Sequence, residues 1–214
     1  QAPPRTSALE QGRGAGLAQG AVGSKYNDLP TEQRQAINQV RRDLGSDPLL
    51  SRIEEAEVRA FEDATEGGDR SLIPAVSALQ SSETIASLLS GDTEKFYGWA
   101  SQGVPFDFDF DIQFSQEEFD SAANKIRAAT QEALLVRGVP DEFLVYRSGN
   151  LPSGTAVGVS LDYMGARGFA FESKREEPGT VKVFRVKRSD VGADMESLFS
   201  GGLTRGENEL LIDS

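Results

Sequence analysis

The spacing of hydrophobic residues predicts a series of helices in the first part of the chain. Between residues 31 and 138, apolar side chains recur every three or four positions, as they do along one face of an amphipathic helix. Gly91 and Gly138 are suitable stops, and Ser115 with Glu118 has the spacing of a capping box. The pattern predicts helices over residues 31–45, 48–67, 73–79, 84–89 and 115–138.

After Pro140 the pattern changes to short segments in which apolar and polar residues alternate, which is typical of strands. It predicts strands over residues 143–147, 155–161, 180–188 and 207–212, and a short helix over 167–171. Residues 1–24 are rich in Gly, Ala, Pro and Gln without an apolar period, which predicts a disordered arm or linker. We therefore expect an α+β protein with an arm (1–24), a helical lobe (25–138) and a β-rich core (139–214).

Composition restricts the chemistry, because the 214 residues include no cysteine and no histidine. Zinc sites built from Cys and His are excluded, and so are nucleophile systems that need an imidazole. Acid–base chemistry has to come from carboxylates, lysine, tyrosine or an oxygen-ligated metal.

Charge restricts the partners. The chain carries 34 acidic against 22 basic side chains, a formal net charge of −12. This balance disfavours direct binding to nucleic acid or to an anionic membrane surface. The sequence also has no apolar run of the roughly 20 residues that a membrane-spanning helix needs. We expect neither nucleic acid nor membrane as a partner.

Two charged segments each allow two interpretations. Phe106–Asp111 alternates three Phe with three Asp, which suits either a carboxylate row for a divalent cation or a half-buried strand with a solvated acidic face. Lys182, Arg185, Lys187 and Arg188 form either the outward face of an ordinary strand or a phosphate contact. The solvated face is the preferred interpretation of both segments.

A more specific set of residues lies in the last third of the chain. Arg147 ends the first predicted strand, Ser160 ends the second, and Glu207 and Glu209 open the last one. Residues two apart share a face of a strand, so the two glutamates would project into the same space. A guanidinium is suited to phosphate, and two neighbouring carboxylates can divide the roles of hydroxyl binding and proton acceptance.

The order of these pieces resembles the Arg-Ser-Glu class of mono-ADP-ribosyltransferases, of the bacterial toxin or bacteriophage type. The resemblance rests on VYRSG (145–149), GVSLD (158–162) with ARGFA (166–170), and RGENELL (205–211). It implies a helical lobe packed on a core of two antiparallel-rich sheets with an NAD cleft. It also implies a secreted or injected effector, or a virion-associated protein.

The resemblance implies a role for each matched residue. Arg147, with Ser148 and Gly149, would bind NAD, the guanidinium holding a phosphate. An aromatic residue such as Phe171 would cover the nicotinamide ring.

The same resemblance assigns the catalytic residues as Arg147, Ser160, Glu207 and Glu209. Ser160 would lie in the Ser-Thr-Ser segment that supports the catalytic glutamate. Glu209 would bind the ribose and stabilise the oxocarbenium-like transition state, while Glu207 would activate the acceptor guanidinium. No metal is implied.

The expected function is NAD-dependent transfer of ADP-ribose to an arginine of a target protein, with NAD and that protein as partners. An NAD glycohydrolase and a non-catalytic binding or structural module on the same fold are the alternatives. The sequence departs from the family pattern at Ser148, where a glycine is usual, and at Gly158, where the first serine of the triplet is usual.

Overall fold

The computed structural model describes residues 25–65, 81–103, 114–149, 151, 156–172, 180–199 and 208–212. Helices come first along the chain and antiparallel strands follow, so the fold is α+β. The predicted arm, the predicted helix over 73–79 and the acidic alternation over 106–111 lie outside the described residues.

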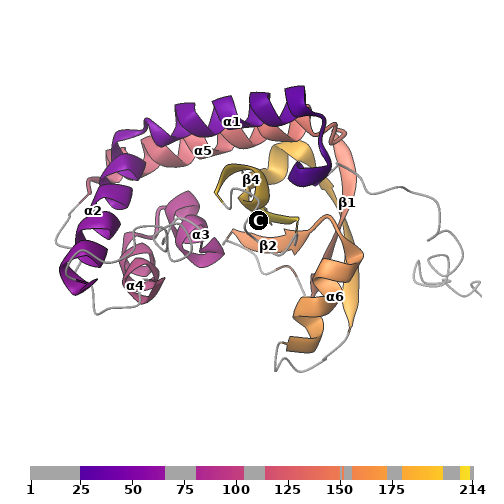
Figure 1. Ribbon diagram of the computed structural model, residues 1–214. Coiled ribbons are helices and arrows are strands. Elements are labelled where there is room, and N and C mark those ends of the chain that lie inside the picture. Colours follow the sequence, from indigo (N-terminus) through magenta and orange to yellow (C-terminus); the bar gives the residue numbers. More distant parts are fainter. Residues whose placement is uncertain are drawn as a thin grey trace, which may run out of the picture.

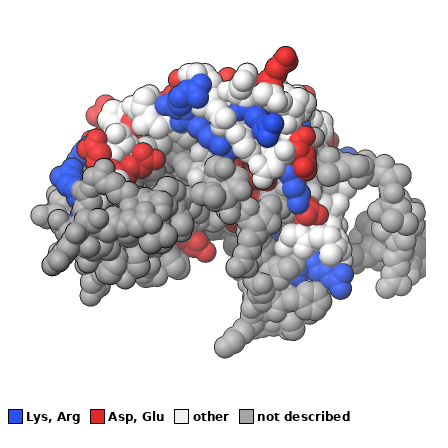
Figure 2. Space-filling view, in the orientation of Figure 1, with Lys and Arg blue, Asp and Glu red and all other residues white. Residues whose placement is uncertain are grey.

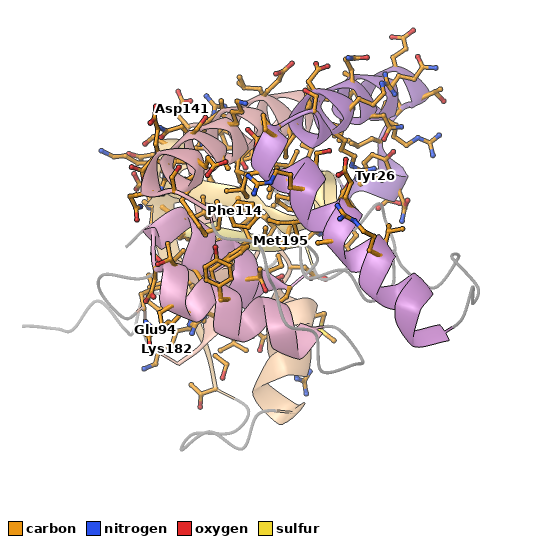
Figure 3. The ribbon with its side chains drawn as sticks, turned by 90° about the vertical axis from the view of Figure 1, so that its left-hand side faces the viewer. Tyr26, Glu94, Phe114, Asp141, Lys182 and Met195 are labelled. Atoms are coloured by element: carbon orange, nitrogen blue, oxygen red, sulfur yellow. The ribbon has the colours of Figure 1, made fainter. Side chains whose placement is uncertain are left out.

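The helical part contains α1 (Thr31–Gly45), α2 (Pro48–Thr65), α3 (Ser82–Ser90), α4 (Thr93–Gly103) and α5 (Gln116–Val136). α1 and α5 lie side by side along one edge of the molecule, and α2 turns away from them toward α3 and α4 (Figure 1). Phe96 of α4 and Phe119 of α5 are fully buried and meet edge to face, with ring centroids 5.0 Å apart. Figure 3 shows Phe114 and Met195 in the same interior, between the helices and the sheet.

The ends of these helices follow from local chemistry. Ser115 and Glu118 form the predicted capping box, in which each side chain bonds the backbone amide of the other residue. α3 ends at Gly91, whose φ of 69° lies in the left-handed region that glycine adopts without strain. The predicted helices over 31–45, 48–67, 84–89 and 115–138 are confirmed as α1, α2, α3 and α5, and the short helix predicted over 167–171 lies within residues 163–172, which are also helical.

The strands β1 (Glu142–Ser148), β2 (Val157–Ser160), β3 (Val181–Lys187), β4 (Val191–Asp194) and β5 (Glu209–Ile212) form a sheet of order β3-β1-β2-β5-β4. Helix α6 (Tyr163–Glu172) connects β2 to β3, and the short α7 (Met195–Leu198) follows β4. All neighbouring strands are antiparallel. Because β1 pairs with both β2 and β3, the strands that the structure describes form one continuous sheet, not the two sheets that the resemblance implies.

The sheet is buried on both faces near its centre. Leu211 of β5 packs into the helical core with Ile85 and Phe96. Leu210, its neighbour, points the other way and packs with Val145 and Val159. This alternation places α3 over the face of β5 that carries Leu211 and, two residues earlier, Glu209.

The basic segment belongs to an edge strand, because β3 pairs only with β1 in the described sheet. Arg185 and Lys187 are exposed, as the preferred interpretation of an outward polar face expects. Arg188 is held at the end of β3 by an ion pair with Asp141 of 2.5 Å. Basic and acidic groups are likewise interspersed over the surface that carries α1 (Figure 2).

Among the helices that the structure describes, none is both long and apolar enough to cross a bilayer.

Candidate functional site

Three of the predicted site residues lie on adjacent strands. Arg147 is on β1, Ser160 is the last residue of β2, and Glu209 is the first residue of β5. Ser160 is paired with Tyr146 on one side and with Glu209 on the other. The sheet therefore brings together residues that are up to 62 positions apart in the sequence, Arg147 and Glu209 (209 − 147).

The carboxylate of Glu209 has a defined position, because each of its two oxygens lies against a different residue. Its Oε1 lies against the backbone of Gly158, where a Cβ added to that glycine would be 2.5 Å away. Its Oε2 accepts a hydrogen bond of 2.5 Å from the Ser82 hydroxyl. Gly158, Ser82 and Glu209 are all half-buried, so the carboxylate is held in place but not sealed from solvent.

Ser82 comes from the helical part of the chain, where it is the first residue of α3. Ser81 caps this helix by accepting the Thr84 amide, and Ile85 and Leu88 anchor the helix with no exposed surface. Figure 1 shows α3 beside the part of the sheet that contains β2. The N-terminus of a helix carries partial positive charge, which favours the neighbouring carboxylate of Glu209.

Arg147 also reaches Gly158, but from the other neighbouring strand. Its Nη1 donates a hydrogen bond to the Gly158 carbonyl. The β1–β2 register pairs Tyr146 with Ser160. The Gly158 carbonyl lies two residues before this pair, and there it accepts from the Arg147 side chain. Because side chains alternate along a strand, Arg147 and Glu209 lie on opposite faces of the sheet. The two side chains nevertheless both reach Gly158, near the start of β2.

Ser160 is buried beside Glu209 and accepts a hydrogen bond of 3.0 Å from the amide of Asp162. Asp162 in turn accepts the Met164 amide at 3.0 Å, at the start of α6. The serine thus contributes to the turn that leads from β2 into α6. Its predicted role in supporting Glu209 remains a prediction.

The backbone just before Glu209 is fixed from inside the protein. Asn208 has a φ of 49°, is 2% exposed, and accepts a 2.7 Å hydrogen bond from Arg137 Nη2. Arg137 Nη1 lies 2.7 Å from Asp194 Oδ2, and both of these side chains are fully buried. Asn208 also accepts the Leu161 amide through its own carbonyl, at 3.1 Å. These contacts fix the backbone at the point where β5 begins with Glu209.

A second buried carboxylate extends this network. Glu196 of α7 accepts the Tyr26 amide at 3.2 Å, and its other oxygen is 4.0 Å from Arg137 Nη2. Burial raises the pKa of Glu196, while the positive charge of Arg137 acts in the opposite direction. The cause that dominates is the loss of water around the carboxylate.

The remaining predicted residues lie at the end of β1 or outside the residues that the structure describes. Ser148 is buried at the end of β1, and Gly149 follows with a φ of 89°. Phe171 falls in α6, but its side chain is outside the described set, and Glu207 lies wholly outside it. Within the ranges that the structure describes, no group of three Asp or Glu is placed to hold a metal ion.

Ser82 and Arg137 belong to this site although no pattern in the sequence marks them for it. Ser82 carried only the signal of a helix start, and Arg137 only that of a basic residue near a helix end. Both act through partners more than 50 residues away in the chain, which no local pattern encodes.

Comparison with models of protein families, with curated proteins and with solved structures finds no match.

Proposed function

We propose that the protein is an NAD-dependent mono-ADP-ribosyltransferase that modifies arginine side chains, with an NAD-binding cleft beside β1, β2 and β5. The observation that carries this proposal is the convergence of Arg147 and Glu209 on Gly158, with Ser160 beside them on the middle strand. An Arg, a Ser and a Glu on three adjacent strands thus bring a cation and a carboxylate to Gly158 from opposite faces of the sheet.

The chemistry suits a chain without histidine. When the bond between ribose C1′ and nicotinamide breaks, its electron pair goes to the nicotinamide nitrogen, so a cationic group leaves as a neutral molecule. Positive charge then develops on the ribose ring, and a fixed carboxylate stabilises it. Glu209 is suited to this task because both of its oxygens have defined neighbours before any substrate arrives.

The transfer step needs a second group. A guanidinium nitrogen of the acceptor forms the new bond to C1′, and the proton that it loses has to be accepted. We assign this proton to Glu207, two residues before Glu209, and the NAD phosphate to Arg147. Loss of Glu207 leaves water as the acceptor, which is the glycohydrolase reaction.

The decisive experiment measures nicotinamide release and transfer of labelled ADP-ribose to protein, with labelled NAD and a cell extract. We expect both in the wild type. Glu209→Gln should lower both by about 10²- to 10³-fold, the usual effect of losing a group that stabilises transition-state charge. Glu142→Gln is the matched control, because Glu142 is an exposed carboxylate on β1 and should leave both rates unchanged.

Two outcomes contradict the proposal. A wild type that releases no nicotinamide under conditions where a known transferase works removes the enzymatic function. A Glu209→Gln variant with full turnover removes the site assignment.

A separate variant tests the acceptor. Glu207→Gln should abolish transfer to arginine and retain slow NAD hydrolysis, because only the acceptor's proton is affected. If Glu207→Gln transfers ADP-ribose as the wild type does, the assignment of arginine as the acceptor is wrong.

A further inference from the structure

The contact between Ser82 and Glu209 joins the helical part of the chain to the sheet at the proposed catalytic carboxylate. The two residues are 127 positions apart, and their hydrogen bond is 2.5 Å long. The other carboxylate oxygen lies where a side chain at position 158 would begin. Gly158, which has no side chain, and Ser82, through its hydroxyl, thus both determine where the Glu209 carboxylate lies.

We infer that Ser82 is the positioning residue of Glu209: it supplies from α3 the hydroxyl that holds the carboxylate, and Gly158 leaves the space that the carboxylate occupies. This inference rests on the proposed function, because it names the residue through which Glu209 is made ready to act. It also gives a physical reason for the glycine where the resemblance expects a serine. A serine side chain at position 158 would collide with Oε1.

The position of Ser82 makes it a good anchor. The first turn of α3 is fixed by the Ser81 cap and by the buried side chains of Ile85 and Leu88, so the hydroxyl has little freedom to move away. A long glutamate side chain otherwise samples several rotamers, and a group that stabilises developing charge works best when it is already in place.

The pair has little to contribute to folding. Ser82 and Glu209 are half-buried, so water replaces the lost partner when either side chain is changed. Removal of the Ser82 hydroxyl should therefore change the state of the carboxylate more than the stability of the protein.

The first test measures nicotinamide release by Ser82→Ala, Ser82→Thr and the wild type. We expect Ser82→Ala to lower kcat by about 10- to 100-fold, the effect of losing one hydrogen bond to a charged group, with the KM for NAD nearly unchanged. Ser82→Thr keeps the hydroxyl and should restore most of the rate. Ser90→Ala is the control, since Ser90 lies at the other end of α3 and bonds the backbone of its own helix. Equal kcat for Ser82→Ala and the wild type would overturn the inference.

The second test does not depend on turnover. The side-chain carboxyl carbon of Glu209 is followed by NMR as a function of pH in protein labelled at glutamate, with Glu209→Gln to assign the signal. Loss of a donor disfavours the charged carboxylate, so the titration midpoint in Ser82→Ala should move to higher pH, and that in Ser82→Thr should stay. An unchanged midpoint contradicts the role of Ser82. A shifted midpoint in a protein that cleaves no NAD contradicts the proposed function alone.

The third test combines Ser82 with Gly158. Gly158→Ser should lower turnover in the wild type, because its Cβ displaces Oε1. In the Ser82→Ala background the carboxylate has already lost the hydroxyl that positions it, and the further loss should be clearly smaller. Losses that simply multiply in the double variant would show that the two residues act independently and would overturn the inference.

Discussion

Arg137 is a fully buried cation whose contacts determine how β5 begins. Its guanidinium bonds Asp194 of β4, the Ser197 hydroxyl and the Asn208 side chain, at 2.7, 3.3 and 2.7 Å. A buried ion pair adds little net stability relative to apolar side chains, but one partner left alone is costly, because a charge then remains in the interior without compensation.

Arg137→Met tests the cost of leaving one partner of this buried ion pair alone. The change leaves the charge of Asp194 buried without its cationic partner, and we expect the free energy of unfolding to fall by about 3–5 kcal/mol. Guanidinium unfolding followed by circular dichroism measures it. Arg185→Met is the control: its guanidinium side chain is 75% exposed and 4.0 Å from Glu142, so the loss should stay below about 1 kcal/mol. A loss below about 1 kcal/mol for Arg137→Met would show that the interior rearranges around Asp194.

At the scale of elements, α5 is the longest helix that the structure describes, and it packs against both α1 and β4. Its N-terminus is closed by Ser115 and Glu118, and the Ser115 backbone amide donates to Glu118 Oε2 at 2.7 Å. This arrangement satisfies backbone donors that have no partner within the helix.

Ser115→Ala should lower stability by about 1 kcal/mol, because the Glu118 amide loses its acceptor. Thermal unfolding measures the change. Ser121→Ala is matched in chemistry and lies in the same helix, but Ser121 is exposed and interior to it, so the higher helix propensity of alanine should leave stability equal or slightly raised. Equal effects of the two variants would show that the cap contributes nothing.

The sequence predicts those elements whose signal is local. Five to six helical turns with a capping box, such as α5, or a strand followed by glycine, such as β1, are evident from periodicity and turn residues. β4 was not predicted, because Val-Gly-Ala-Asp is short and contains only one large apolar side chain. It becomes a strand through its pairing with β5, which the local sequence does not encode.

The candidate site divides in the same way. Arg147, Ser160 and Glu209 were assigned from their places at or near the ends of predicted strands together with the resemblance of the surrounding motifs to a transferase family. Ser82 and Gly158 were not assigned their places. The contact of Ser82 with Glu209 depends on how α3 meets the sheet, and that of Gly158 depends on the pairing of β2 with β5. The local sequence shows which residue stands at a strand end. It does not show which residues hold that side chain in place, because they come from other parts of the fold.

At the scale of the whole molecule, one buried network joins the start of the described chain to its last strand. The Tyr26 ring lies 4.2 Å below the Arg41 guanidinium, and Arg41 donates to the Glu196 carbonyl at 3.2 Å. Glu196 approaches Arg137, which holds Asn208. This network fixes four segments to one another: the segment before α1, the end of α5, α7 and the start of β5. A change in the charge of Glu196 therefore alters contacts in all four.

This network predicts how stability depends on pH. Burial raises the pKa of Glu196 in the folded protein, so the folded state binds its proton more tightly than the unfolded chain does. The resulting stabilisation is fully present below the unfolded pKa and is lost as pH rises through the folded pKa. Glu196→Gln removes this titration and keeps an oxygen for the Tyr26 amide, so its stability relative to the wild type should increase from about pH 4 to pH 7.

Urea unfolding of both proteins across that range measures the difference directly. Glu55→Gln, a change at a carboxylate on α2 whose side chain is 63% exposed, should alter stability by less than about 0.5 kcal/mol at each pH. A Glu196→Gln variant that becomes less stable relative to the wild type as pH rises would mean that attraction to Arg137 outweighs the cost of burial. Ionised Glu196 would then hold these four segments together, whereas we expect its ionisation to loosen them.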